Sequence, residues 1–212
     1  EKIFQLESVG SKDWLTNKVD RCVTGKVAQQ QCIGELQLPL SNCGVMALDY
    51  NGKNGVATSV GHSPLTGLID PKIGSINSIA KSLTNIIWAP LEKGLESVSL
   101  SANWMWPCKN EGEDARLYSA VESLSKFAIN LGINVPTGKD SLSMKQKYKD
   151  GEVLSPGTVI ISAAANCNGR NVREERRGTY SSRAPGTAWD VHTQAQVAHV
   201  LTGRIRQERW EK

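Results

Sequence analysis

The chain has 212 residues, of which 39% are hydrophobic and 22% are charged, a composition typical of a soluble globular protein with one large domain or a domain plus an appendage. No apolar run approaches the ~20 residues that span a bilayer, and the N-terminus lacks the apolar core of a signal peptide. The five cysteines are scattered without close pairs, which argues against a disulfide framework or a zinc site and favours reduced thiols in the cytoplasm.

The sequence predicts, in chain order, a helix, an extended polar segment, two strands, a helix, a strand, a helix and a strand. These elements span residues 11–20, 21–40, 44–50, 55–60, 73–88, 98–100, 114–131 and 158–165. Ser11 is the expected N-cap of the first helix, Asn51-Gly52 predicts the turn between the paired strands, and Asp70-Pro71 is expected to break the chain. This order indicates an α+β fold.

The helix expected over 114–131 carries the strongest periodic pattern. Its apolar stripe comprises Leu117, Val121, Leu124, Phe127, Ala128 and Leu131. Gly132 follows directly and predicts the end of the helix, because glycine adopts the left-handed conformation of a helix C-cap without steric cost.

Residues 138–144 read GKDSLSM, and they follow Val135-Pro136, which favours an extended entry. Glycine lets the backbone approach a ligand closely and lysine supplies a point charge, so the run is expected to be a loop that touches phosphate or another polar ligand. A plain polar surface turn is the alternative interpretation.

The net charge of +4 comes entirely from the C-terminal end. Residues 1–168 carry 16 basic and 16 acidic side chains, whereas residues 169–212 carry nine basic and five acidic ones. The cations also change from mostly lysine to mostly arginine at this point. The switch favours a tail of different coding origin, frame-shifted or vector-derived, over 169–212. A basic tail that binds nucleic acid is the weaker alternative, because the segment has mixed charges and lacks interleaved aromatic residues.

Several separated segments together resemble one enzyme family. They are RCVTGKVAQQQCIG at 21–34, ATSVG at 57–61, LTN at 83–85, LSANWM at 100–105, GEDARLY at 112–118, GKDSLSM at 138–144 and PGTVIISA at 156–163. In this order and spacing they resemble the large single-chain form of phosphoribosylformylglycinamidine synthase, the purine-pathway amidotransferase of the AIR-synthase-related superfamily. The resemblance covers 1–168 and is confined to the N-terminal module of the second AIR-synthase-like half.

The resemblance implies a mixed sheet with helices on one face, and a parent enzyme that is an ATP-dependent carbon–nitrogen ligase. That enzyme converts formylglycinamide ribonucleotide to formylglycinamidine ribonucleotide with glutamine as the amide donor, using ATP and magnesium. The residues that the resemblance places near nucleotide are Ser41, Asn42, Lys81, Asn85, Gly138 and Lys139. Asn103 and Ser141 are expected to contact substrate and Asn85 to ligate magnesium, while no catalytic residue carries over. A packed aromatic corner is the alternative for 103–106.

Two positions of the expected nucleotide site depart from the family pattern. Asn42 stands where the family has an acidic residue, and Lys81 stands where it has a glutamate four residues before Asn85. Magnesium prefers hard anionic oxygen ligands, so the site is expected to bind it poorly. Lys81 is then expected either to pair directly with phosphate or to mark a degenerate site. Glu35 also replaces the usual proline.

Three hypotheses remain open from the sequence. The chain is a fragment of the synthase that is inactive alone, a non-catalytic nucleotide-binding or assembly module, or a basic-tailed nucleic-acid binder. Modules of this superfamily pair sheet to sheet, so a homodimer is expected with 44–48 and 98–100 near the contact.

Overall fold

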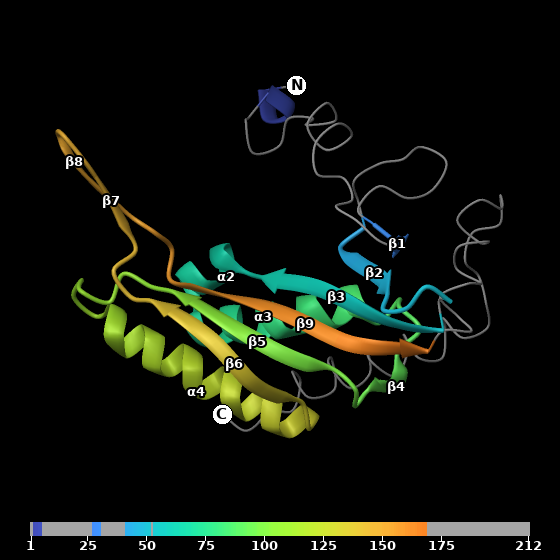
Figure 1. Cartoon of the computed structure of the whole chain (residues 1–212). Coiled ribbons are helices and arrows are strands. Elements are labelled where there is room, and N and C mark those ends of the chain that lie inside the picture. The colour runs from blue at the N-terminus through green and yellow to red at the C-terminus, as the bar shows by residue number, and fades with distance from the viewer. Residues whose placement is uncertain (1, 6–26, 31–40, 52, 169–212) are drawn as a thin grey trace.

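A six-stranded sheet with helices on one face dominates the computed structural model, which describes residues 2–5, 27–30, 41–51 and 53–168 (Figure 1). In spatial order its strands are β1 (Val27–Gln29), β2 (Cys43–Ala47), β3 (Asn54–His62), β9 (Thr158–Asn168), β5 (Ser99–Met105) and β6 (Asn134–Ser141). The other described elements are η1 (Lys2–Gln5), α2 (Pro64–Ile69), α3 (Pro71–Ile86), β4 (Glu92–Leu95), α4 (Glu113–Leu131) and the hairpin strands β7 (Lys145–Tyr148) and β8 (Gly151–Leu154).

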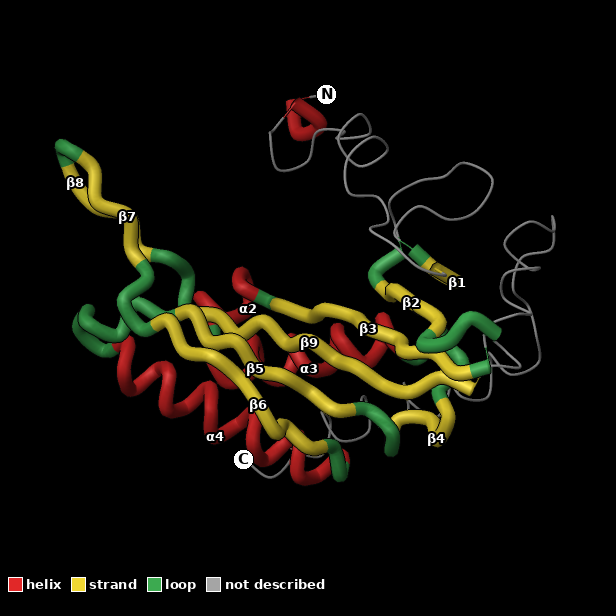
Figure 2. The backbone as a smooth tube through the Cα atoms, viewed as in Figure 1, coloured by secondary structure: helices red, strands yellow, loops and turns green. Residues whose placement is uncertain are grey.

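The sheet is mixed because β5, α4 and β6 form a crossover unit. β5 pairs with β6 in parallel, and parallel neighbours need a long connection, which α4 provides. All other ladders of the sheet are antiparallel. The expected α+β class, with a mixed sheet and helices on one face, is therefore confirmed (Figure 2).

Helix α3 begins where the sequence analysis expected only a break. The Asp70 carboxylate accepts hydrogen bonds from the backbone N–H of Lys72 at 2.8 Å and Ile73 at 3.3 Å. Pro71 occupies the first helical position, where its missing N–H costs nothing. The Asp-Pro pair thus caps the helix, which starts two residues earlier than predicted.

Helix α4 confirms the predicted periodic element and its glycine stop. It spans Glu113–Leu131 and ends at Gly132, which has a φ of 69°. One member of the predicted stripe was wrong: Val121 is 40% exposed, whereas Ala120 is fully buried. The small alanine side chain lies on the stripe because α4 packs directly against α3.

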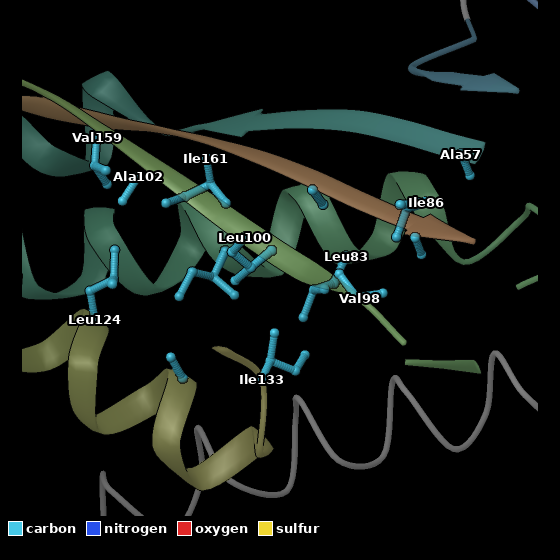
Figure 3. Packing of buried hydrophobic residues seen from close by; sticks show 14 of the residues in the cluster. Ala57, Leu83, Ile86, Val98, Leu100, Ala102, Leu124, Ile133, Val159 and Ile161 are labelled. Atoms are coloured by element: carbon cyan, nitrogen blue, oxygen red, sulfur yellow. The ribbon is translucent and has the colours of Figure 1, made fainter. Parts of the chain in front are cut away.

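The hydrophobic core lies between the sheet and helices α3 and α4, and alternate strand residues point into it (Figure 3). Its least exposed members from the sheet and helices include Val45, Ala57, Leu100, Val159, Ile161, Ile79, Leu83, Ile86 and Ala120. Trp104 and Trp106 also face this side, with ring centroids 6.3 Å apart, so the aromatic corner expected as an alternative for 103–106 is present.

The opposite side of the sheet, here called the open face, has no helix against it among the described elements (Figures 1 and 2). By strand alternation and register its residues include Gly44, Met46, Thr58, Val60, His62, Ser99, Ser101, Asn103, Met105, Lys139, Ser141, Ile160 and Ser162. Val98 and Leu100, expected near a sheet-to-sheet contact, are 3% and 1% exposed in the core. Ser99 between them points to the open face, because one step along a strand reverses the side chain, so the expected contact near 98–100 stays a prediction.

Three short features escaped prediction: α2, β4 and the β7–β8 hairpin, which projects away from the sheet (Figure 1). The predicted strands over 44–50, 55–60 and 158–165 correspond to β2, β3 and β9, and the strand predicted to start at 98–100 corresponds to β5. The predicted helix over 11–20 and the tail 169–212 lie outside the described residues. No described helix is long and apolar enough to cross a membrane.

Candidate functional site

The first group of predicted site residues meets where β2 begins beside β3 and α3 ends. Cys43 pairs with Ser59, and Asn42 comes immediately before it as an exposed residue. The next residue of β3, Val60, accepts a hydrogen bond at its carbonyl from Nδ2 of Asn85 at 3.0 Å. We call Ser41, Asn42, Lys81 and Asn85 the corner group.

Hydrogen bonds and helical spacing arrange the other two members of the corner group. The Ser41 hydroxyl accepts from Nε2 of Gln29 at 3.0 Å and donates to the Cys43 carbonyl at 3.2 Å, so it ties β1 to the start of β2. Lys81 is exposed on α3, one turn before Asn85, and residues four apart share a helix face. The corner therefore presents hydroxyl, amide and ammonium groups, and none of its members is a carboxylate.

The second group lies on β5 and β6 at the opposite edge of the sheet. The prediction that 138–144 forms a loop was wrong, because its first four residues belong to β6. Position 138 requires glycine for a reason that the sequence alone does not show. A Cβ on Gly138 would overlap the carbonyl oxygen of Ala102 on β5. The close approach of two strands is enough to require glycine at position 138, and a contact of Gly138 with nucleotide stays a prediction.

Register brings the remaining predicted residues of β5 and β6 together on the open face. Lys139 is opposite Asn103, and Ser141 is opposite Met105. The Lys139 ammonium donates to the Ser141 hydroxyl at 2.6 Å. Oδ1 of Asn103 is buried and has no hydrogen-bond partner among the described residues. We call Asn103, Lys139 and Ser141 the edge group.

The two groups do not form one site within the described part of the chain. Three strand spacings separate β3 from β6, which amounts to roughly 14 Å. The groups also face different ways, since Lys81 is on a helix beneath the sheet and Lys139 is on the open face. A single nucleotide pocket containing both Asn85 and Lys139 would therefore need further structure to connect them.

Magnesium is a poor fit to the corner group. Mg²⁺ prefers several anionic oxygen ligands in octahedral geometry, whereas the corner group offers neutral oxygens beside the Lys81 cation. Within the described residues no cluster of three or more His, Cys, Asp or Glu side chains is arranged to hold a metal ion. Asn85 as a magnesium ligand stays a prediction that this donor set does not favour.

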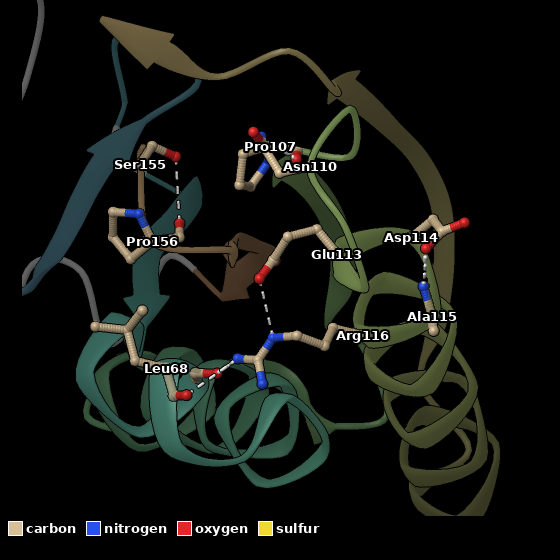
Figure 4. Close-up of polar contacts among 10 residues, drawn as sticks. Leu68, Pro107, Asn110, Glu113, Asp114, Ala115, Arg116, Ser155 and Pro156 are labelled. Atoms are coloured by element: carbon tan, nitrogen blue, oxygen red, sulfur yellow. Dashed lines mark hydrogen bonds and ion pairs between the residues drawn. The ribbon is translucent and has the colours of Figure 1, made fainter. Parts of the chain in front are cut away.

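Arg116 in the GEDARLY segment has a role that sequence analysis missed. Its Nη2 donates to the carbonyl oxygens of Gly67 at 2.7 Å and Leu68 at 3.1 Å, near the end of α2, while its Nε lies 3.4 Å from Oε1 of Glu113 (Figure 4). Bonds to the last carbonyls of a helix satisfy groups that have no intrahelical partner. Arg116 thus fastens α2 to the start of α4.

Cys108 lies beside the same helix start. Its backbone N–H donates to the Leu142 carbonyl at 3.1 Å, just beyond the edge group. Burial raises the pKa of the half-buried Cys108 thiol, and the carboxylates of Asp114 and Glu113 raise that pKa further. The thiol is therefore less readily ionised than an ordinary exposed cysteine.

Comparison with known families identifies the fold and the sequence pattern. The profile of the FGAR-AT PurM_N-like domain matches residues 11–166, most of the chain. The chain belongs to the FGAR-AT PurM_N-like domain family. The resemblance drawn from the separated motifs is thereby confirmed, whereas the exact division at residue 168 stays a prediction.

Curated relatives of this FGAR-AT PurM_N-like domain carry one name. The chain is 45% identical over 167 residues to the phosphoribosylformylglycinamidine synthase of Homo sapiens and 43% identical over 167 residues to that of Drosophila melanogaster. Each alignment covers 79% of this chain but 12% of the relative. The chain thus spans about one eighth of the length of the curated relatives it matches.

Solved structures share the fold of the FGAR-AT PurM_N-like domain at low sequence identity. PurL from Thermotoga maritima complexed with ADP has a TM-score of 0.56 and 16% identity, and the match covers 78% of this chain and 25% of that one. PurL complexed with FGAR from the same organism has a TM-score of 0.52 and 15% identity, covering 76% and 24%. These likenesses establish the fold.

Proposed function

We propose that this chain works as one module of a phosphoribosylformylglycinamidine synthase. Such an enzyme is an ATP-dependent ligase of purine biosynthesis that uses glutamine to convert formylglycinamide ribonucleotide to formylglycinamidine ribonucleotide. The names of relatives 43–46% identical to this chain support the assignment. Because the chain spans 12% of those relatives, the glutaminase and the other modules belong to the remaining length of such a protein.

The edge group carries the proposal. A lysine ammonium held by a serine hydroxyl provides cationic and polar donors for a phosphate oxygen, while the unpartnered Oδ1 of Asn103 is a ready acceptor for an N–H or O–H of the substrate. A buried acceptor without a partner carries a desolvation cost, and a ligand that donates to it would remove that cost. We infer that Asn103 and Ser141 contact substrate and that Lys139 contacts phosphate.

The corner group supports nucleotide binding of an unusual kind. With Asn42 and Lys81 in place of two acids, local charge rises by about three units relative to the family pattern: two negative charges lost and one positive gained. Lys81 then attracts phosphate directly, and ADP or ATP binding depends little on magnesium and weakens with salt. The same two residues favour the second candidate function, a non-catalytic nucleotide-binding or assembly module.

The open face supports a proposal about how copies of this chain associate. Met46 and Val60 on this face are 46% and 48% exposed, and exposed apolar side chains on a sheet favour association. We propose a homodimer through the open face, with Met46 from the segment 44–48, Val60, and Ser99 from the segment 98–100 near the contact. A cytoplasmic location also stays a prediction. The nucleic-acid hypothesis depends on residues 170–209, which lie outside the described residues.

Titration of the purified chain with ADP and ATP, with and without magnesium, tests the proposal. We expect binding in both conditions and loss of binding as salt increases. The chain alone should show no synthase activity with glutamine or ammonia, because the family's acyl-phosphate step uses both paired halves. Turnover by the purified chain alone would contradict the assignment of a single module, and absence of nucleotide binding in every condition would favour a purely structural assembly role.

A further inference from the structure

Helix α3 approaches strand β3 unusually closely at the corner group. A Cβ on Gly61 would overlap backbone atoms of Ser78 and Ser82. The helix residues that face Gly61 are also small, since Ser78 and Ser82 lie one turn apart and are buried. Small residues on both elements let the helix backbone lie directly against the strand backbone.

One side chain bonds across this contact. The buried hydroxyl of Ser59 on β3 donates to the Ser82 carbonyl of α3 at 2.7 Å. Two buried serines of α3 keep their hydroxyl bonds within the helix: Ser78 donates to the Gly74 carbonyl at 2.9 Å, and Ser82 donates to the Ile79 carbonyl at 2.8 Å. Among these three serines, Ser59 alone has a side chain that joins the strand to the helix.

Ser59 stands between the two parts of the corner group. Its backbone pairs with Cys43, the residue after Asn42, while its hydroxyl reaches Ser82, which lies between Lys81 and Asn85. The Asn85 amide in turn donates to the Val60 carbonyl, one residue beyond Ser59. The Nδ2 bond orients the amide and leaves Oδ1 of Asn85 to accept from a ligand.

We propose that Ser59 is a positioning residue for the corner group. By holding α3 against β3, the Ser59 hydroxyl keeps Nδ2 of Asn85 within hydrogen-bond distance of the Val60 carbonyl. It also fixes the position of Lys81 relative to Asn42. The consequence for nucleotide affinity rests on the function proposed above, whereas the consequence for the Asn85 amide does not. The Ser59 hydroxyl would act on a ligand only through the side chains that it helps to place, as hydroxyls behind a binding group commonly do.

The test compares two serine-to-alanine changes in the whole chain. Ser59→Ala removes the bond between strand and helix, and Ser78→Ala is the matched control, since it removes a buried hydroxyl that bonds within the helix. We expect hydrogen exchange of the Asn85 side-chain amide, followed by NMR, to become at least about tenfold faster in Ser59→Ala and to change less than about twofold in Ser78→Ala, because only the first change frees Asn85 from Val60.

ADP affinity is measured on the same proteins. We expect about a three- to tenfold loss in Ser59→Ala and no significant loss in Ser78→Ala. Equal effects of the two changes on the Asn85 amide would overturn the inference and leave Ser59 with a general packing role. If the unmodified chain binds no ADP, the proposed function of the corner fails while the amide measurement still decides the positioning role. If Ser59→Ala does not fold, Ser59→Cys tests the positioning role instead. Because a thiol is a weaker donor than a hydroxyl, the Asn85 amide should then exchange faster than in the unmodified chain, and an unchanged rate would overturn the inference.

Discussion

The corner group was predicted to contact nucleotide and the edge group to contact nucleotide phosphate and substrate, yet the two groups are built differently. At the corner, close packing of the α3 backbone on β3 places neutral amide and hydroxyl groups beside the exposed ammonium group of Lys81. At the edge, the residues lie on two paired strands, where Lys139 donates to Ser141 beside the buried Oδ1 of Asn103. The corner thus depends on the packing of a helix against the sheet, whereas the edge depends on the register of two strands.

Gly138→Ala should cause the largest change, and it acts at the edge alone. The added Cβ would overlap the Ala102 carbonyl and force β6 away from β5. We expect the free energy of unfolding to fall by about 2–4 kcal/mol, measured by urea denaturation. Gly44→Ala is the control, because its Cβ would lie 3.4 Å from Oγ1 of Thr58, an ordinary contact distance. Similar losses of stability in both variants would show that the contact between Gly138 and Ala102 does not tolerate a Cβ any less than an ordinary strand position does.

The double change Asn42→Asp with Lys81→Glu should restore metal dependence at the corner. Local charge falls by three units, one from the new aspartate and two from exchanging a cation for an anion. We expect ADP binding to become magnesium-dependent, by about tenfold or more in isothermal titration calorimetry. Strong magnesium dependence already present in the unmodified chain would mean that the nucleotide binds elsewhere.

Lys139→Met should weaken phosphate binding at the edge and leave the fold intact. The side chain is exposed, so a methionine of similar length fits, while the charged donor is lost. We expect phosphate-ligand affinity to fall by about tenfold, with a shallower dependence on salt. Lys147→Met on the hairpin is a matched control that removes an exposed lysine away from both groups. Equal effects of the two changes would indicate non-specific electrostatic attraction.

The smallest expected effect is on the reactivity of the Cys108 thiol, which lies near the end of β6. Because burial and the carboxylates of Asp114 and Glu113 raise the pKa of the thiol, less thiolate exists at any pH near that pKa. Alkylation by iodoacetamide, located by peptide mass spectrometry, should therefore be slower than for an exposed cysteine and should rise at higher pH. Asp114→Asn should speed the reaction by a few-fold at pH 8. No difference between the variants would mean that burial alone sets the reactivity.

The long periodic elements were the most predictable part of the fold. The stripe that ends at Gly132 identified α4, because burial of one helix face imposes a regular spacing on the sequence, and apolar runs identified β2 and β9. Short elements such as α2 and β4 escaped because they have too few residues to show a period. The motifs also pointed to the family, since several separated matches in a fixed order are far more specific than any one of them.

Tertiary structure alone decided what the individual site residues do. The composition of GKDSLSM favours a loop, and only pairing with β5 makes its first four residues a strand, in which the closeness of Ala102 requires glycine at position 138. Likewise, Ser59 and Arg116 lie inside matching motifs, but their bonds to Ser82 and to the carbonyls of α2 join residues 23 and 48–49 positions apart. The sequence by itself determined the fold class, the long elements and the family, because these depend on local periodicity and on ordered motifs. The separation of the corner from the edge depends on strand order, and strand order is set by contacts that no local pattern records.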